Sequence, residues 1–144
     1  MDAELIDRQD YERARLQLGA SFQRILGYFR EDGIRSVAAV EQAMRDRNAA
    51  SLVIPAHTLK GESRQFGSRA LGDLAERIEM GARQCVEHRT GPEELIGDVA
   101  DLRACFERTL AELEYHAGPA ALPRASTGFG RKTPALSLNG LTRS

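Results

Sequence analysis

The chain has 144 residues, of which 42% are hydrophobic and 28% charged, and its formal net charge is −1. This size and composition are those of one globular domain, and the near-neutral charge with an aromatic content of 6% excludes a basic nucleic-acid or membrane-surface binder. No apolar run approaches the roughly 18 residues of a membrane span, and the acidic N-terminus lacks a signal-peptide core, so we expect a cytoplasmic protein without membrane contacts.

The first predicted elements are a short helix and a long one. A weakly amphipathic segment at about 4–17 is expected to form a helix that covers one end of the fold. A long helix is predicted from about 20 to 47, because its apolar residues keep one phase of a 3.6-residue period. Gly33 softens this helix by about 1 kcal/mol but does not break the phase. The residues in phase are Phe22, Ile25, Leu26, Phe29, Val37, Val40 and Met44.

Three further amphipathic helices follow. One begins near Asn48, ends at Gly67 and carries the stripe Leu52, Ala56, Leu59, Ser63 and Phe66. The next runs from about 69 to 88, with Ser68 as a candidate N-cap and the stripe Leu71, Leu74, Ala75, Ile78, Ala82 and Cys85. The last opens at Pro92 and runs to about 116 through Leu95, Val99, Leu102, Phe106 and Leu113. Because short turns join these helices and no strand period occurs, we predict an all-α fold, an antiparallel four-helix bundle with the N-terminal helix capping one end.

The composition changes after residue 116. Residues 117–144 contain four basic residues and no acidic one, together with three of the five prolines. We therefore predict a bundle at 1–116 and a basic, disordered tail at 117–144, which could act as a tether or an anion-docking arm.

Most signatures of enzymatic chemistry are absent from the sequence. It has no Walker loop, dinucleotide-binding glycine motif, HExxH or nucleophile elbow, so we expect no cofactor. Cys85 and Cys105 are too few and too far apart for a disulfide framework or a metal site and are interpreted as free thiols. His88 and His116 lie near predicted helix C-termini, where the helix dipole favours a cation.

His57 differs because it lies almost opposite the core stripe of its helix and should face solvent. Lys60, Gly61 and Arg64 share its face at i+3, i+4 and i+7. An exposed imidazole beside two cations is suited to carry an anionic group, and a glycine leaves the approach of a second protein open. A plainly solvated helix face is the alternative interpretation.

The segment A-H-T-L-K-G at 56–61 resembles the A-H-x-L-K-G signature of histidine-containing phosphotransfer (HPt) domains. Further matches are Asp46, Phe66-Gly67, Leu71, Leu74 and Ile78-Glu79, so the resemblance covers roughly residues 19–112. It implies a four-helix bundle with the histidine on its second long helix, in agreement with the helix periods.

The resemblance also implies a function in multistep phosphorelays. His57 would accept a phosphoryl group from the aspartyl phosphate of a receiver domain in a hybrid histidine kinase and pass it to the receiver of a response regulator. Lys60 would neutralise phosphoryl oxygens, and Gly61 would leave room for the receiver. The protein would be a phosphocarrier without ATP-dependent kinase activity. Because no acidic cluster is expected around His57, the divalent metal should belong to the receiver.

Val53 and Ile54 fall on either side of His57, one turn before it, and with Arg64 they are candidate docking residues. The alternative is that the N-terminal segment or the helix start covers the two apolar residues. The sequence departs from the family pattern at Glu62, where a small residue is usual, and at Pro55, which lacks an N–H donor. Glu62 could pair with Arg64 or Arg69, or repel an acidic partner.

Two other functions fit a helical bundle. The first is the dimerisation and phosphotransfer part of a sensor kinase, but there the histidine is usually followed by an acidic residue and an ATP-binding domain is needed. The second is a helical adaptor that binds signalling partners without phosphotransfer, in which His57 would be incidental.

Overall fold

The computed structural model describes residues 5–118, and none of these residues lies in a strand. The helices in chain order are α1 (Arg8–Leu18), the 3₁₀ turn η1 (Gly19–Ser21), α2 (Phe22–Arg45), α3 (Ala49–Gln65), α4 (Arg69–His88), the 3₁₀ turn η2 (Glu93–Leu95) and α5 (Ile96–Ala117). Residues up to Leu113 form one compact unit and a second unit begins at Glu114. The predicted tail lies, from residue 119 onward, outside the described residues. Within the described range, no helix is long and apolar enough to cross a membrane.

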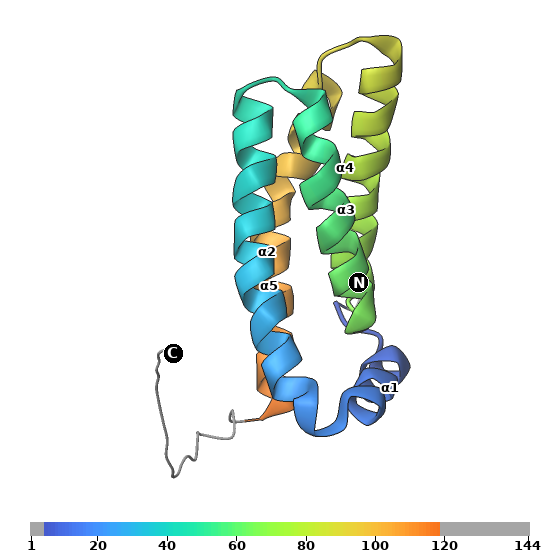
Figure 1. Ribbon diagram of the computed structural model, residues 1–144, viewed down its shortest axis with the longest axis vertical. Helices are drawn as coiled ribbons and strands as arrows, with labels where there is room; N and C mark the ends of the chain where they lie inside the picture. The colour runs from blue at the N-terminus through green and yellow to red at the C-terminus, as the bar shows by residue number, and fades with distance from the viewer. Residues whose placement is uncertain (1–4, 119–144) are drawn as a thin grey trace, which may run out of the picture. The chain divides into compact units, whose positions relative to one another are not determined.

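In the first unit, α2, α3, α4 and α5 run in alternating directions and lie side by side (Figure 1). This is the four-helix bundle that the apolar stripes predict. The helix expected at 69–88 has these bounds, and the long helix expected at 20–47 is α2 preceded by η1. Pro92 opens the turn η2 rather than α5, which begins four residues later.

The core consists of the predicted stripes, except that Ile25 and Met44 are only half-buried. At its centre the ring of Phe29 contacts Phe66, with centroids 5.4 Å apart, and Phe106, at 5.7 Å. A Cβ atom on Gly33 would overlap the ring of Phe106. Gly33 therefore allows α5 to approach α2 closely, a role that the sequence did not reveal.

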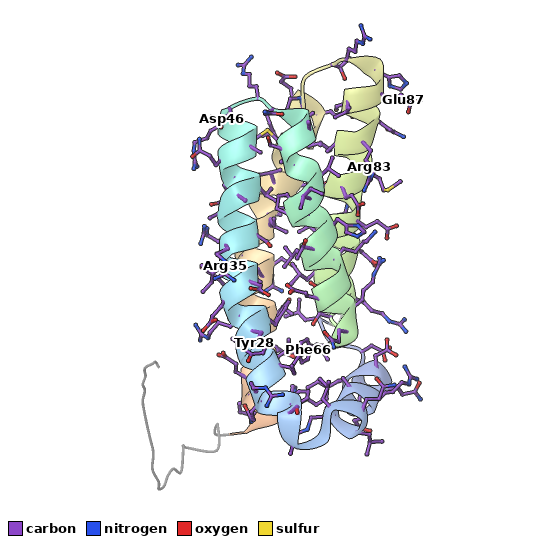
Figure 2. All side chains as sticks on the ribbon, in the orientation of Figure 1. Tyr28, Arg35, Asp46, Phe66, Arg83 and Glu87 are labelled. Carbon is purple, nitrogen blue, oxygen red and sulfur yellow. The ribbon has the colours of Figure 1, made fainter. Side chains whose placement is uncertain are left out.

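Both ends of α3 are fixed by specific contacts. At its start the Asn48 side chain accepts a hydrogen bond from the backbone N–H of Ser51 at 3.1 Å. After Phe66, which lies at the end of α3 near α1 (Figure 2), Gly67 takes a φ of +75°. The carbonyl of Gly67 accepts a 2.7 Å hydrogen bond from the N–H of Asp7, which ties the start of α1 to this turn.

Two expectations about where helices begin need correction. The N-terminal helix starts at Arg8, later than the expected residue 4, because Asp7 is its N-cap and accepts from the N–H of Asp10. Ser68 stands at the N-cap position of α4 but makes no capping hydrogen bond. Its hydroxyl is buried without a hydrogen-bond partner in the described part of the chain.

Candidate functional site

His57 projects from the solvent face of α3, and its side chain is 58% exposed. Its neighbour Ala56 and the residue Leu59 are fully buried. Because a helix turns about 100° per residue, burying these two positions directs His57 outward. The exposure expected from the sequence is thus present.

A buried carboxylate from the next helix lies under the imidazole. Glu79 of α4 has a side chain that is only 3% exposed, and its Oε2 lies 3.0 Å from Nδ1 of His57. Its other oxygen, Oε1, lies 2.8 Å from Nζ of Lys60. Arg83, one turn further along α4, donates to Oε2 from Nε at 3.0 Å and from Nη2 at 2.8 Å. One carboxylate therefore joins His57, Lys60 and Arg83.

The charges around Glu79 keep it ionised. Burial alone would raise its pKa, but hydrogen bonds from Lys60, Arg83 and His57 outweigh burial and lower the pKa to about 2. An ionised carboxylate only accepts hydrogen bonds, so the Nδ1 of His57 is the donor in this contact. In a neutral imidazole with this proton on Nδ1, the second ring nitrogen, Nε2, carries the lone pair.

The sequence reasoning did not place Glu79 or Arg83 at the site. Glu79 entered only as part of the family match, without the contact that its carboxylate makes with the ring of His57. The available signal was the position of Glu79 about 40° from Ala75 on the helical wheel, at the edge of the buried stripe. A carboxylate there needs a cationic partner, and Arg83 follows it at i+4.

Lys60 and Gly61 differ in how open they are. The Lys60 side chain is 20% exposed and its ammonium group is already paired with Glu79. A Cβ added to Gly61 would meet no heavy atom within 4 Å. The surface beside His57 is therefore bare at Gly61, as expected, while the charge of Lys60 is shared with Glu79.

The three candidate docking residues lie in different surroundings. Ile54 is 69% exposed. Val53 is half-buried, which corrects the expectation that it is exposed. It lines a hollow of about 290 Å³ between α3 and α4 with Ala50, Arg83, Val86 and Glu87.

Arg64 is engaged within the protein. Its Nη2 donates to Asp73 at 2.9 Å and to Glu76 at 2.5 Å, both on α4. Its stem lies over Gly72, where a Cβ would come within 2.9 Å of its Cγ. Arg64 therefore links α3 to α4, and its charge is not simply presented to a partner as the sequence suggested.

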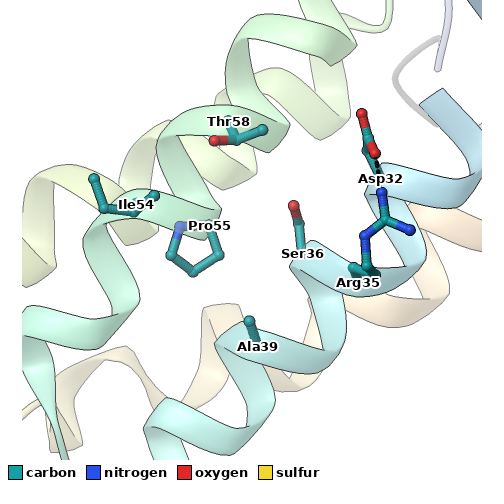
Figure 3. A pocket seen from close by; sticks show the side chains of 7 residues that line it. All are labelled: Asp32, Arg35, Ser36, Ala39, Ile54, Pro55 and Thr58. Atoms are coloured by element: carbon teal, nitrogen blue, oxygen red, sulfur yellow. Dashed lines mark hydrogen bonds and ion pairs between the residues drawn. The ribbon is translucent and has the colours of Figure 1, made fainter. Parts of the chain in front are cut away.

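On the other side of His57, a groove of about 460 Å³ separates α2 from α3 (Figure 3). Ile54, Pro55 and Thr58 line it from α3, and Ser36 and Ala39 line it from α2. The ion pair of Asp32 with Arg35 closes one end. The surface next to His57 is thus apolar and open toward α2, and charged toward α4.

The two departures from the family pattern have structural outcomes. Helix α3 continues through Pro55, whose ring faces the groove. Glu62 does not pair with Arg64, which binds α4, or with Arg69, which binds Asp7 and Asp10. Instead, burial and the adjacent carboxylate of Asp32 raise the pKa of Glu62 to about 7.

The other titratable candidates lie away from this site. His88 is the last residue of α4 and is exposed. Cys85 is buried and Cys105 is half-buried, and both are free thiols. Over residues 5–118, no group of three or more His, Cys, Asp and Glu side chains could hold a metal ion.

His57 lies on an open face of a helical bundle, where a second protein can reach it. A family model described as Hpt domain matches residues 24–114, which include His57, Lys60, Gly61 and Glu79. No curated protein and no solved structure matches the chain. The match covers more than half of the chain, which therefore belongs to the Hpt domain family. Membership implies a phosphotransfer role in phosphorelays, as a phosphocarrier that interacts with receiver domains.

Proposed function

We propose that His57 accepts a phosphoryl group from the aspartyl phosphate of one receiver domain, in a hybrid histidine kinase, and passes it to the aspartate of a second receiver, in a response regulator. The observation that carries the proposal is the contact between Nδ1 of His57 and the buried carboxylate of Glu79, at 3.0 Å. This contact fixes the ring and leaves Nε2 as the attacking atom on an exposed face.

The transfer needs no further reactant. The lone pair of Nε2 attacks phosphorus while the bond from phosphorus to the aspartyl oxygen breaks, and its electron pair leaves on the aspartate carboxylate. The ring then carries the phosphoryl group on Nε2 and a proton on Nδ1, and Glu79 stabilises its positive charge. In the second transfer an aspartate oxygen of the other receiver attacks phosphorus, and the electron pair of the N–P bond returns to Nε2.

Lys60 supplies a cation to this step. Phosphoryl transfer depends on positioning and charge neutralisation more than on covalent chemistry by the protein. Lys60 stands at i+3 from His57, and its ion pair with Glu79 fixes the position of its ammonium group. From this position the ammonium group can bind the negatively charged phosphoryl oxygens. The divalent metal that the reaction uses would come with the receiver, and the two proteins would meet in the cytoplasm.

The docking face combines the exposed Ile54, the bare Gly61 and the groove between α2 and α3. A receiver element can approach the backbone at Gly61 without first displacing a side chain, because no heavy atom lies within 4 Å of a Cβ placed there. Small apolar patches of this kind suit transient complexes. Val53 contributes less, because it is half-buried beside Arg83.

The test is transfer of labelled phosphoryl from a phosphorylated receiver to the full chain. We expect an acid-labile, alkali-stable label on the wild type and on His88→Gln, and none on His57→Gln, with unchanged helical circular dichroism in all three. Label retained in His57→Gln would refute the assignment of the acceptor. Binding of the receiver without any label on the wild type would instead support the helical adaptor.

A further inference from the structure

Two donors compete for one oxygen atom at the site. Oε2 of Glu79 receives Nδ1 of His57 at 3.0 Å and also Nε and Nη2 of Arg83 at 3.0 and 2.8 Å. Lys60 takes the other oxygen. A carboxylate oxygen offers two lone pairs. Arg83 therefore withdraws part of the charge that Glu79 could otherwise direct at the imidazole.

We propose that Arg83 is a positioning residue that keeps Nε2 of His57 free of a proton near neutral pH. The inference rests on the proposed function and deepens it. A buried carboxylate beside an imidazole favours the doubly protonated, cationic ring, which has no lone pair for attack on phosphorus. Arg83 opposes this in two ways, by its own positive charge and by its two hydrogen bonds to the shared oxygen.

Among the charged groups around His57, Arg83 and Lys60 are the cations that contact Glu79. His57 and Lys60 reach Glu79 from α3, and Arg83 reaches it from α4. Further along the same helices, Arg64 pairs with Asp73 and Glu76. Glu87 lines the same hollow as Arg83, and Figure 2 shows both on α4. Lys60 holds Oε1, so Arg83 is the cation that shares an atom with His57.

The size of the effect follows from Coulomb's law. Arg83 and Nδ1 of His57 bind the same oxygen of Glu79, and removing one charge at that separation, in a partly solvated site, moves the pH profile of a histidine by about half a unit to one unit. Both actions of Arg83 have the same sign, so its loss shifts the profile upward. On the acid side of the profile, transfer should fall by about three- to tenfold and should recover fully at higher pH.

The experiment measures two properties of the full chain from pH 5.5 to 9. The first is the transfer rate from a phosphorylated receiver, and the second is the pH dependence of the His57 ring ¹⁵N signals without any phosphodonor. We compare the wild type with Arg83→Met, Arg83→Lys and the control Arg77→Met, which removes an exposed arginine of α4 that pairs with Asp98. Arg83→Met should shift both profiles upward, Arg83→Lys should stay closer to the wild type because it keeps the charge, and Arg77→Met should not shift either.

Coincident profiles for Arg83→Met and Arg77→Met would overturn the inference. A loss of transfer that is equal at every pH, with unchanged ring signals, would assign Arg83 a merely structural role. The ring signals need no phosphoryl group, so they test Arg83 even if the wild type fails to accept one. That failure would refute the proposed function alone.

Discussion

Substitution of Gly61 should separate stability from function. Gly61 lies inside α3, and a Cβ at this position meets nothing within 4 Å. Glycine costs a helix interior about 0.5–1 kcal/mol relative to alanine. Gly61→Ala should therefore raise the free energy of unfolding by that amount, which corresponds to a gain of about 2–6 °C in Tm for a domain of this size.

The same methyl group should hinder phosphotransfer. If the receiver packs against the bare backbone at Gly61, the methyl overlaps a close interface, which typically costs about 1–3 kcal/mol. At subsaturating receiver concentration this predicts a transfer rate lower by about five- to 150-fold. Gly61→Gln should reduce transfer further, because its side chain reaches across the face beside His57.

The assay pairs thermal unfolding with transfer kinetics on the same preparations. Gly27→Ala is the matched control: it is also a helical glycine with nothing within 4 Å of its Cβ, and on the wheel it faces away from the groove. It should gain stability and transfer at the wild-type rate. Wild-type transfer by both Gly61 variants would refute the open docking face, and a lower Tm for Gly61→Ala would show that the position is not open in solution.

Three further predictions concern the groove and the core. Glu62 has a pKa raised to about 7, so its ionisation lowers the stability of the wild type as pH rises from about 4.5 to 7. Glu62→Gln should remove this decline, and urea unfolding at pH 5 and pH 8 measures the free energy of unfolding of both proteins. An equal decline in the wild type and in Glu62→Gln would contradict the role of Glu62. Gly33→Ala should destabilise the fold by about 1–3 kcal/mol despite its better helix propensity, and Phe106→Leu should recover part of the loss; additive effects in the double mutant would contradict the contact. Ile54→Ser should weaken receiver binding with a change in Tm of only a few degrees, and unchanged affinity in a titration would remove Ile54 from the docking face.

The sequence predicts the helices well because each stripe depends on a local period. Phe29, Leu59 and Ile78 are buried where the 3.6-residue repeat places them, and His57 is exposed for the same reason. Contacts between helices depend on how the helices are rotated and shifted along their axes relative to one another. The periodicity of a single helix contains no information about either. The sharing of Glu79 by His57 and Arg83 is of this kind, and so is the fit of Phe106 against Gly33.

Side chains that reach over a neighbouring helix account for the remaining differences. Val53 lies on the outer face of α3 by its wheel position, but Arg83 and Val86 border it from α4. Arg64 extends across Gly72 to two acids, so its exposed position on the wheel gave no indication of its ion pairs. Long side chains on adjacent helices thus decide how much of a predicted surface is free.

The shared carboxylate also affects how the protein meets its partners. Before phosphorylation, the charges of Glu79, Lys60 and Arg83 sum to one positive charge beside His57. A dianionic phosphoryl group on a ring protonated at Nδ1 cancels that charge. Long-range attraction should then speed the encounter of the empty carrier with an acidic receiver pocket and vanish for the loaded carrier. Association of the empty form should accordingly slow with added salt, while association of the phosphorylated form should depend on salt much less.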